Sequence, residues 1–354
     1  MMKSFFKNNG RRFLSALLMI ALTVCLVSCG TVETSDVKRL KLGVVIYDEG
    51  DLFLKEITDE LIAQAKKRSK TSGEKLQITV SVRYARSKQN IQDDQVEDLI
   101  DNGCNVLAVN LVDRNDPMDI IDMAKKNNIP VIFFNRELVL QDLNRWNGLY
   151  YVGARAAQSG QIQGQECVEY LKQHPEVDRN HDGKIQYVVL RGEINHQDAI
   201  IRTDRSINTI LDNGIPLDKL SYEVANWSRL QAENKMNQLL ESYGNSIELV
   251  LCNNDDMALG VLDALQKRNL SRTSYPVIFG VDGAKEVLSD IKKGLIQGTV
   301  YNDGKTQADK VMDIAVRAFE GKDLRGLSMT DGKSTYVDYR KVTIDNVDQF
   351  LSLK

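Results

Sequence analysis

Seven short apolar runs in this sequence each end at, or a few residues before, a polar or aromatic side chain that could contact a ligand. Helical patterns separate most of these runs, which is typical of repeated β-α units with parallel strands. The carboxyl ends of parallel strands line one edge of a sheet, and ligands bind outside that edge. We therefore expect one cleft to collect side chains from distant parts of the sequence. The residues at these ends are Asp51, Phe53, Asn110, His196, Asp198, Trp227, Asn254, Asp282 and Asn302.

The chemistry of this set suits a neutral polyhydroxy ligand, because most of its members are amides and carboxylates. Arg202 lies four residues after Asp198 in a helical pattern, so the two side chains can share one face. A guanidinium offers paired donors to neighbouring hydroxyls, and charged hydrogen bonds are the strong ones. The rings of Phe53 and Trp227 would cover the apolar C–H faces of a pyranose.

Several of these residues also have a purely structural explanation. Asp51, Asn254 and Asp282 precede helical patterns, where Asp and Asn are favoured N-caps. Asn302 could belong to a turn, and Phe53 could belong to the core. The occurrence of all of them at strand ends favours a common ligand site.

A second chemical pattern, at positions 178–186, matches the start of a calcium loop of the EF-hand type. Position 7, Lys184, would contribute its backbone carbonyl, while position 12, which should be a bidentate Glu, is Val189. The alternative is a polar turn between a helix and a strand. We favour calcium, with the missing carboxylate supplied from elsewhere in the fold. The matching positions 1, 3, 5 and 6 are Asp178, Asn180, Asp182 and Gly183.

Composition excludes some classes of function. The 354 residues are enough for two core-forming domains. The formal net charge is −3, and it becomes −7 without the four basic residues of positions 1–28, so we expect no nucleic-acid partner. Cys104, Cys167 and Cys252 have no close pairing, which argues against a disulfide framework. Because Cys252 lies in a fully apolar run, it is predicted to be a buried, inert thiol.

The N-terminus predicts export. Basic residues precede an apolar stretch at 13–27, which is shorter than the about 20 residues of a membrane span. The sequence LVSCG at 26–30 resembles a bacterial lipobox. We therefore predict a signal peptide at 1–28, lipid attachment at Cys29, a tether at 29–40, and an extracytoplasmic, membrane-anchored protein. The alternatives are an ordinary signal peptide with cleavage elsewhere, or an uncleaved anchor.

Alternating periodicities predict an α/β fold with two doubly wound domains, because the parallel strands are too many for one small sheet. Strands are expected at 41–47, 76–84, 105–109, 130–134, 149–152, 185–190, 219–225, 247–252, 276–281 and 335–339. Helices are expected at 52–69, 88–101, 117–127, 157–173, 197–213, 229–243, 256–268 and 305–319.

The motifs that carry these residues resemble those of the bacterial galactose/glucose-binding proteins, which are periplasmic-type sugar-binding proteins of ABC transporters. The resemblance covers about residues 40–350. Its landmarks are LGVVIYDEGDLF, AVNLVD, IPVIFFN, YYVG, DRNHDGKIQ, RGEINHQDAIIRT, ANWSRLQA, IELVLCNND, FGVD and GTVYND. The segment Asp48-Glu49-Gly50 is more acidic and flexible than this family predicts.

The resemblance implies a role for each candidate residue. Phe53 and Trp227 would stack on the two faces of the sugar. Hydrogen bonds to the sugar would come from Asp51, Asn110, His196, Asp198, Arg202, Asn254, Asp282 and Asn302. Calcium would be held by Asp178, Asn180, Asp182, the Lys184 carbonyl, Gln186 and Glu248, with Glu248 as the missing carboxylate.

The resemblance also implies two Rossmann-like lobes, of periplasmic binding protein type I, that close over the ligand around three chain crossings. The crossings are expected near 129–131, 301–304 and 336–340. The N-terminal lobe would comprise 41–130 plus 304–337, and the C-terminal lobe 131–303 plus 338–354, with the calcium site in the second.

The implied function is capture without catalysis. A monomer would bind D-galactose or D-glucose, with methyl-galactosides as further candidates, and deliver the sugar to the permease of an ABC importer. An alternative is a sensor that presents bound sugar to a membrane chemoreceptor. A different class of function is a secreted glycosidase that uses Asp51 and Asp282 as its carboxylate pair. Another alternative is a sugar-responsive repressor, but an export signal occupies the position of the DNA-binding domain that a repressor would need.

Overall fold

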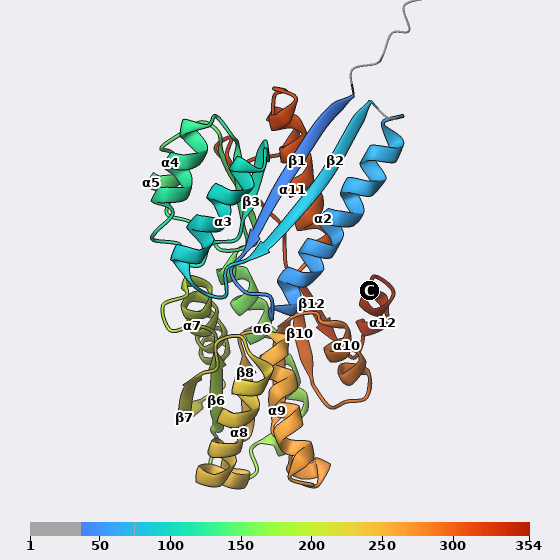
Figure 1. Cartoon of the computed structure of the whole chain (residues 1–354). Helices are drawn as coiled ribbons and strands as arrows, with labels where there is room; N and C mark the ends of the chain where they lie inside the picture. The colour runs from blue at the N-terminus through green and yellow to red at the C-terminus, as the bar shows by residue number, and fades with distance from the viewer. Residues whose placement is uncertain (1–36, 74) are drawn as a thin grey trace, which may run out of the picture.

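The computed structural model describes residues 37–73 and 75–354, which form two α/β lobes that lie one above the other in the view of Figure 1. Each lobe contains one six-stranded sheet. Within the described part of the chain, no helix is long and apolar enough to cross a membrane. The predicted signal peptide and the predicted lipid-attachment residue Cys29 lie outside the described residues.

The first lobe has the strand order β11-β5-β4-β3-β1-β2. Strands β3 and β4 are completely buried, which explains why their sequences are continuous apolar runs rather than alternating ones. The strands are β1 (Lys38–Ile46), β2 (Leu76–Tyr84), β3 (Val106–Val109), β4 (Val131–Phe134), β5 (Leu149–Gly153) and β11 (Ser334–Tyr336). The helices are α2 (Leu52–Thr71), α3 (Gln89–Asp101), α4 (Met118–Lys126), α5 (Leu140–Leu143) and α11 (Gly304–Phe319).

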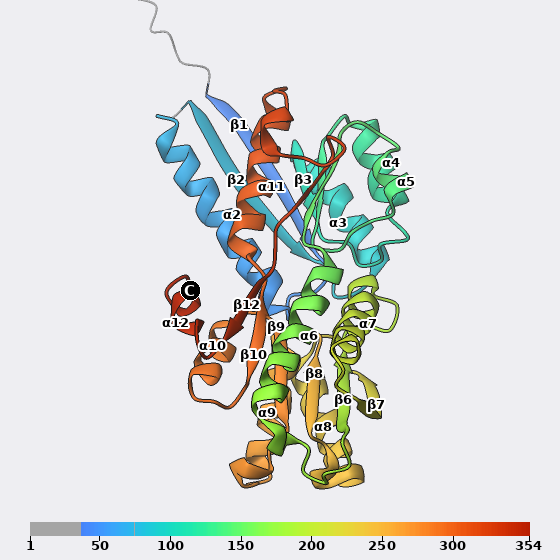
Figure 2. The same cartoon turned by 180° about the vertical axis from the view of Figure 1, so that it is seen from behind.

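The second lobe has the strand order β12-β10-β9-β8-β6-β7. Its pairs are parallel except for β10 and β12, which are antiparallel and lie close to the junction of the lobes (Figure 2). The strands are β6 (Ile185–Arg191), β7 (Leu217–Val224), β8 (Leu249–Cys252), β9 (Val277–Asp282), β10 (Gly298–Tyr301) and β12 (Arg340–Thr343). The helices are α6 (Ala156–Gln173), α7 (Gln197–Asp212), α8 (Arg229–Tyr243), α9 (Asp255–Lys267), α10 (Lys285–Lys292) and α12 (Val347–Leu351). The predicted class, two doubly wound parallel lobes, is confirmed.

The predicted first crossing, near 129–131, is wrong. Strand β4 pairs with β3, and β5 pairs with β4, so both belong to the first lobe. The chain leaves that lobe only between Gly153 and α6. The lobes therefore comprise about 38–153 plus 304–336 and about 154–303 plus 337–354, instead of the predicted boundary at 130/131. A buried apolar run predicts a strand, but its composition does not indicate which of two sheets it joins.

The other two crossings lie between β10 and α11 and between β11 and β12. The single strand expected at 335–339 is in fact two strands, because the chain passes from one sheet to the other at 337–339. Three connections thus join the lobes, and the carboxyl ends of the parallel strands of both sheets point toward the gap between them (Figure 1).

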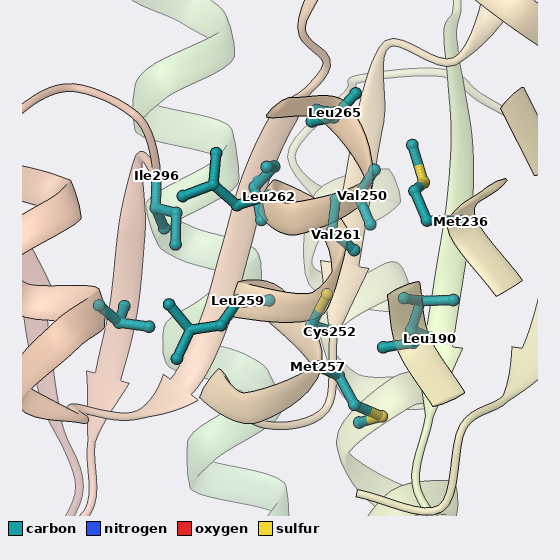
Figure 3. Close-up of a cluster of buried hydrophobic side chains, with 14 of the residues drawn as sticks. Leu190, Met236, Val250, Cys252, Met257, Leu259, Val261, Leu262, Leu265 and Ile296 are labelled. Carbon is teal, nitrogen blue, oxygen red and sulfur yellow. The ribbon is translucent and has the colours of Figure 1, made fainter. Parts of the chain in front are cut away.

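Each lobe has its own hydrophobic core on both faces of its sheet. In the second lobe, Cys252 lies among Leu190, Met257 and other aliphatic side chains (Figure 3). Cys104, Cys167 and Cys252 are all free and buried, and burial raises the pKa of each thiol. The prediction of a buried, inert Cys252 is therefore confirmed.

Glu166 is a buried carboxylate of the second lobe that forms no ion pair with another described residue. Glu166 of α6 is 1% exposed, and it accepts a hydrogen bond from the backbone N of Val342 in β12 at 3.0 Å through one oxygen. Its other oxygen has no partner among the described residues. Burial raises the pKa of Glu166 well above its ordinary value.

This carboxylate should make stability fall with rising pH. Because the folded-state pKa is the higher one, the stabilising contribution is complete below the unfolded-state pKa and is lost as pH rises through the folded-state pKa. Glu166→Gln should therefore match the wild type in melting temperature near pH 4.5 and exceed it by about 3 °C or more at pH 7.5. Thermal unfolding at both pH values is the measurement. Glu169→Gln, an exposed change on the same helix, is the control, and equal gains in both variants would contradict the assignment.

Candidate functional site

A small, partly open cavity of about 40 Å³ lies between the two lobes. Nine of the ten sugar-binding residues that the sequence predicts line this cavity, and they come from both lobes. These are Asp51, Phe53, His196, Asp198, Arg202, Trp227, Asn254, Asp282 and Asn302. The cavity also contains three residues that the sequence did not single out: Tyr47, Asn135 and Arg136.

Three of the predicted residues, Asp51, Asn254 and His196, each cap a helix and line the cavity at the same time. Asp51 caps α2 by accepting from the backbone N of Leu54 at 3.0 Å, and it also accepts from the Tyr47 hydroxyl at 3.1 Å. Asn254 caps α9 through the backbone N of Met257, and its Nδ2 donates to the Trp227 carbonyl at 3.2 Å. The capping bond fixes the side chain and leaves further hydrogen-bonding capacity for a ligand. The structural and the functional explanations therefore hold together.

Asn110 does not line this cavity. It is fully buried, and its Oδ1 accepts from the backbone N of Tyr47 at 3.3 Å. Its Nδ2 donates to the Phe134 carbonyl at 3.2 Å and to Asn135 Oδ1 at 3.1 Å. Asn110 therefore ties together the ends of β1, β3 and β4 and holds Asn135, which is the asparagine that reaches the cavity. The same signal, a polar residue after the apolar run VIFF, could have found Asn135.

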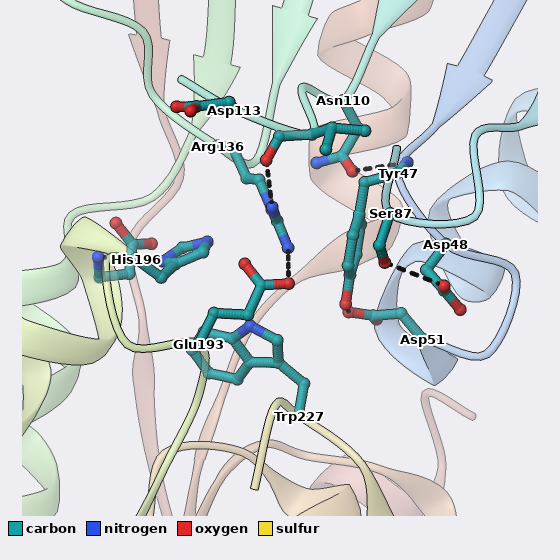
Figure 4. Close-up of polar contacts among 12 residues, drawn as sticks. Tyr47, Asp48, Asp51, Ser87, Asn110, Asp113, Arg136, Glu193, His196 and Trp227 are labelled. Atoms are coloured by element: carbon teal, nitrogen blue, oxygen red, sulfur yellow. Dashed lines mark hydrogen bonds and ion pairs between the residues drawn. The ribbon is translucent and has the colours of Figure 1, made fainter. Parts of the chain in front are cut away.

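Arg136 joins the two lobes across the edge of the cavity (Figure 4). Its guanidinium lies 3.7 Å from the centre of the Tyr47 ring and donates to the Val112 carbonyl at 2.8 Å. Its other terminal nitrogen donates to Glu193 of the second lobe at 2.9 Å. Arg136 is only 5% exposed, so its end of the ion pair is shielded from water, whereas the Glu193 side chain is 31% exposed. Arg136 and Glu193 are 57 positions apart, and no local pattern in the sequence predicts that they form a pair.

His196, Asp198 and Arg202 surround the second-lobe side of the cavity. His196 caps α7, with Nδ1 accepting from the backbone N of Asp198 at 3.2 Å, and burial lowers its pKa, so the ring is neutral. Arg202 is held by Ser159 Oγ at 2.8 Å and the Tyr339 hydroxyl at 3.2 Å, and it also donates to the Asn253 carbonyl. Burial raises the pKa of Asp198 to about 6, and the positive charge of Arg202 opposes that rise.

Trp227 and Phe53 supply the two aromatic surfaces, one from each lobe. Trp227 has a left-handed backbone (φ 62°), and its ring meets His196 edge-on at 4.9 Å between centres. A side chain at Gly192 would lie about 2.1 Å from the Trp227 ring, so glycine is required there. The Trp227 indole nitrogen is buried and has no partner among the described residues. Phe53 is 9% exposed and packs partly into the first-lobe core.

Asp282 and Asn302 stand next to the second crossing. Asn302 Nδ2 donates to Asp282 Oδ1 at 3.3 Å, and the buried Gln307 orients Asn302 by donating to its Oδ1 at 2.6 Å. Burial raises the pKa of Asp282 well above its usual range, and Arg202 opposes that rise. The cavity thus offers carboxylate and amide acceptors and a guanidinium donor around two rings, which is an arrangement for holding hydroxyl groups.

The predicted calcium loop brings its residues together around the start of β6. Glu248 Oε1 accepts from the backbone N of Arg179 at 2.6 Å, and its Oε2 accepts from the backbone N of Gln186 at 3.0 Å. Glu248 is 2% exposed, and it reaches the loop although it is 62 positions from Gln186 in the sequence. The remaining loop contacts join Asp178 to Asp182 and Gly183, Asn180 to Asp182 and Gln186, and Asp182 to Lys184 and Gln186.

The donor set of this loop fits calcium. The Asn180 and Gln186 amides donate to Asp182 Oδ2 at 3.1 and 2.9 Å, and turning either amide over would present its oxygen there instead. Calcium takes six to eight oxygen ligands of such mixed type. In residues 37–73 and 75–354, no group of three or more His, Cys, Asp or Glu side chains could hold a metal by itself. A calcium site here therefore depends on amide and carbonyl oxygens as well as carboxylates.

Known proteins share this architecture and much of this sequence. Residues 42–323 match the family model described as the periplasmic binding protein domain. The D-galactose/methyl-galactoside binding periplasmic protein of Haemophilus influenzae is 35% identical over 92% of this chain and 96% of its own length. The xylitol-binding protein of Mycolicibacterium smegmatis is 28% identical over 91% of this chain and 83% of its own length.

A solved structure has the same fold. The ABC transporter solute binding protein of Bacillus halodurans, with bound myo-inositol, superposes with a TM-score of 0.73 at 25% identity. The match covers 91% of this chain and all of that one.

Proposed function

Because this chain belongs to the periplasmic binding protein domain family, we propose that its interlobe cavity captures a neutral hexose, D-galactose or D-glucose, for an ABC importer. The coarser role, a sugar-binding, extracytoplasmic solute-binding protein of transport and not an enzyme, follows from the family and its relatives. The choice of hexose is supported by the 35% identical galactose/methyl-galactoside binding relative. The observation that carries the proposal is the convergence of nine residues, distant in the sequence, on one cavity between the lobes.

The proposed mechanism is capture by closure. Sugar hydroxyls donate to the carboxylates of Asp51, Asp198 and Asp282 and accept from Arg202. Phe53 and Trp227 cover the two apolar faces of the ring from opposite lobes. A sugar bound in this way stabilises the closed form, because groups of both lobes contact it. The permease then recognises that form.

Sugar discrimination would follow from the buried polar groups. An analogue that lacks one hydroxyl leaves a buried carboxylate or amide without its partner, which costs several kcal/mol. Galactose and glucose differ in the orientation of one hydroxyl, and a carboxylate with two oxygens can accept from either orientation.

The two tryptophans of the chain allow a direct test. Trp227 lines the cavity, whereas Trp146 packs beside the first-lobe core. Addition of D-galactose or D-glucose should change the emission of the wild type and of Trp146→Phe. Trp227→Phe should lose that change and bind both sugars more weakly. A monosaccharide panel by thermal shift identifies the preferred sugar, since a ligand of the native state raises its melting temperature.

Two outcomes would contradict the proposal. One is that no hexose in the panel raises the melting temperature. The other is that the emission change persists in Trp227→Phe and disappears in Trp146→Phe. Hydrolysis of nitrophenyl-galactoside by the wild type, with loss in Asp282→Ala, would favour the glycosidase alternative instead.

We further propose a structural Ca²⁺ at the loop that contains Asp178, Asn180, Asp182, Gln186 and the Lys184 carbonyl, closed by Glu248. The convergence of three carboxylates and two amides supports it. A bound cation would supply positive charge to carboxylates that otherwise face one another. It would also fix the junction of α6 with β6 and β8 without taking part in sugar binding.

Anchoring of the mature N-terminus through lipid on Cys29 is part of the same proposal, and the lipobox-like sequence supports it. The described residues begin at 37, and β1 begins at Lys38, so the last three residues of the predicted tether at 29–40 belong to the first strand instead. Mass spectrometry of the membrane fraction should detect the lipidated N-terminus, and Cys29→Ala should release the protein from that fraction. Release of wild type and variant alike would contradict lipid anchoring.

A further inference from the structure

Asp256, in the first turn of α9, lies where the second lobe meets the start of α2 in the first lobe. Its side chain is 8% exposed, and Leu52 is the first residue of α2. Both residues border the two grooves that lead to the cavity from either side. Asp256 thus lies at the interface between the two lobes.

Helix α9 does not need Asp256 as a cap. Asn254 already accepts from the backbone N of Met257. Asp255 accepts from Thr299 Oγ1 and from the backbone N of Ala284, both at 2.7 Å, and so is anchored within its own lobe. Asp256 makes neither of these contacts; it lines one of the two grooves together with Asp51 and Leu52 of the opposite lobe.

The charges around Asp256 are mostly of the same sign. Asp51 faces it from the first lobe and Asp255 from its own helix, and both disfavour its ionisation. Arg229 of α8 favours ionisation, but it is already bound to Asp263 at 2.6 Å and to Glu286 at 2.9 Å. The other charged groups around the two grooves are Asp48, Lys55, Glu56, Asp59, Glu60, Glu193, Asp282, Lys285, Lys305 and Lys354.

We propose that Asp256 couples closure of the lobes to the uptake of one proton. In the closed form, protonation of Asp256 removes its repulsion with Asp51 across the lobe interface. In an open form, Asp51 moves away with its lobe and Asp256 becomes hydrated, so the proton is released. This inference rests on the proposed function only in that a bound sugar is taken to stabilise the closed form.

The expected pH dependence has a definite sign. In the closed structure, burial raises the pKa of Asp256 to about 7, with Asp51 as the second cause. Exposure in the open form would return it toward about 4. Between these two values the closed form holds a proton that the open form lacks, so sugar affinity falls by up to about tenfold for each pH unit of increase. Above about pH 7 this contribution to the affinity is constant.

The experiment compares the wild type with Asp256→Asn, which keeps the side-chain shape and removes the titration. D-Galactose and D-glucose are titrated calorimetrically from pH 5.0 to 8.0, and the proton count is measured at pH 6 in two buffers of different ionisation enthalpy. The wild type should take up about one proton more than Asp256→Asn. At pH 8 the variant should bind about tenfold or more tightly than the wild type, because its closed form carries no repelling charge. Glu49→Gln, an exposed change of equal charge in the neighbouring loop, should behave as the wild type.

Small-angle X-ray scattering of the sugar-free proteins separates this inference from the choice of ligand. The wild type should become more compact as pH falls from 8 to 5, whereas Asp256→Asn and Asp256→Ala should show a smaller change or none. If neither sugar binds but this difference appears, the hexose assignment fails and the proton coupling stands. Equal proton counts with equal scattering responses in wild type and Asp256→Asn overturn the coupling.

Discussion

Asp282→Ala is expected to lower the affinity for the preferred hexose by about 100-fold or more. Asp282 lines the cavity, and its carboxylate is positioned by Asn302 and, through Asn302, by Gln307. A charged acceptor that bonds a buried hydroxyl contributes about 1.5–3 kcal/mol for each bond, and loss of the carboxylate also leaves Asn302 without its acceptor. Isothermal titration calorimetry with D-galactose and D-glucose measures the change.

The matched control is Asp48→Ala. Asp48 stands at the rim, where it bonds Ser87 and the backbone N of Gly50. Its removal should change the affinity by less than about threefold, as for a solvated charge. An Asp282→Ala protein that retains its melting temperature and binds either sugar within threefold of the wild type would exclude Asp282 from the site.

Chelation of calcium should lower the melting temperature by about 5–10 °C. A ligand present at 100 times its dissociation constant stabilises the native state by about 2.7 kcal/mol, and each kcal/mol shifts the melting temperature by about 2–4 °C in a domain of this size. Glu248→Gln should reproduce the loss and should no longer respond to chelator. This substitution keeps one oxygen for the two backbone donors, Arg179 and Gln186, and removes the charge that the cation requires.

Glu241→Gln is the control for that experiment, because Glu241 is an exposed acid of the same lobe paired with Arg268. It should retain the full response to chelator and to added Ca²⁺. Sugar affinity should change little in either variant, since the loop and the cavity do not share residues. A wild-type melting temperature that is the same with calcium and with chelator would contradict the calcium assignment.

The sequence predicted the fold class and most of the cavity because both depend on local patterns. Each candidate residue follows an apolar run, and the rule that parallel strands end at one edge brings such residues together. Asp51 and Asn254 satisfied the capping and the ligand interpretations at once. The local patterns therefore identified individual side chains correctly without any information about their partners.

The features that the sequence did not predict all depend on pairing between distant segments. The first crossing was misplaced because the runs VIFF and LYYVG are apolar enough for either sheet, and only the pairing of β4 with β3 and of β5 with β4 assigns them to the first lobe. Asn110 and Asn135 both follow apolar runs, but only Asn135 reaches the cavity. The Arg136–Glu193 ion pair joins the two lobes, and Asp256 lines one groove with Asp51 and Leu52 of the other lobe; no periodicity encodes such proximity.

The threading of the chain through both lobes has a consequence for biosynthesis. The first sheet needs β11 at its edge, and the second needs β12, so neither lobe is complete until residues near 340 have emerged from the ribosome. Domains usually fold as units during synthesis, N-terminal first. Here no complete N-terminal lobe can fold early during synthesis. The chain would therefore stay unfolded and able to pass through a secretion channel that accepts only unfolded chains.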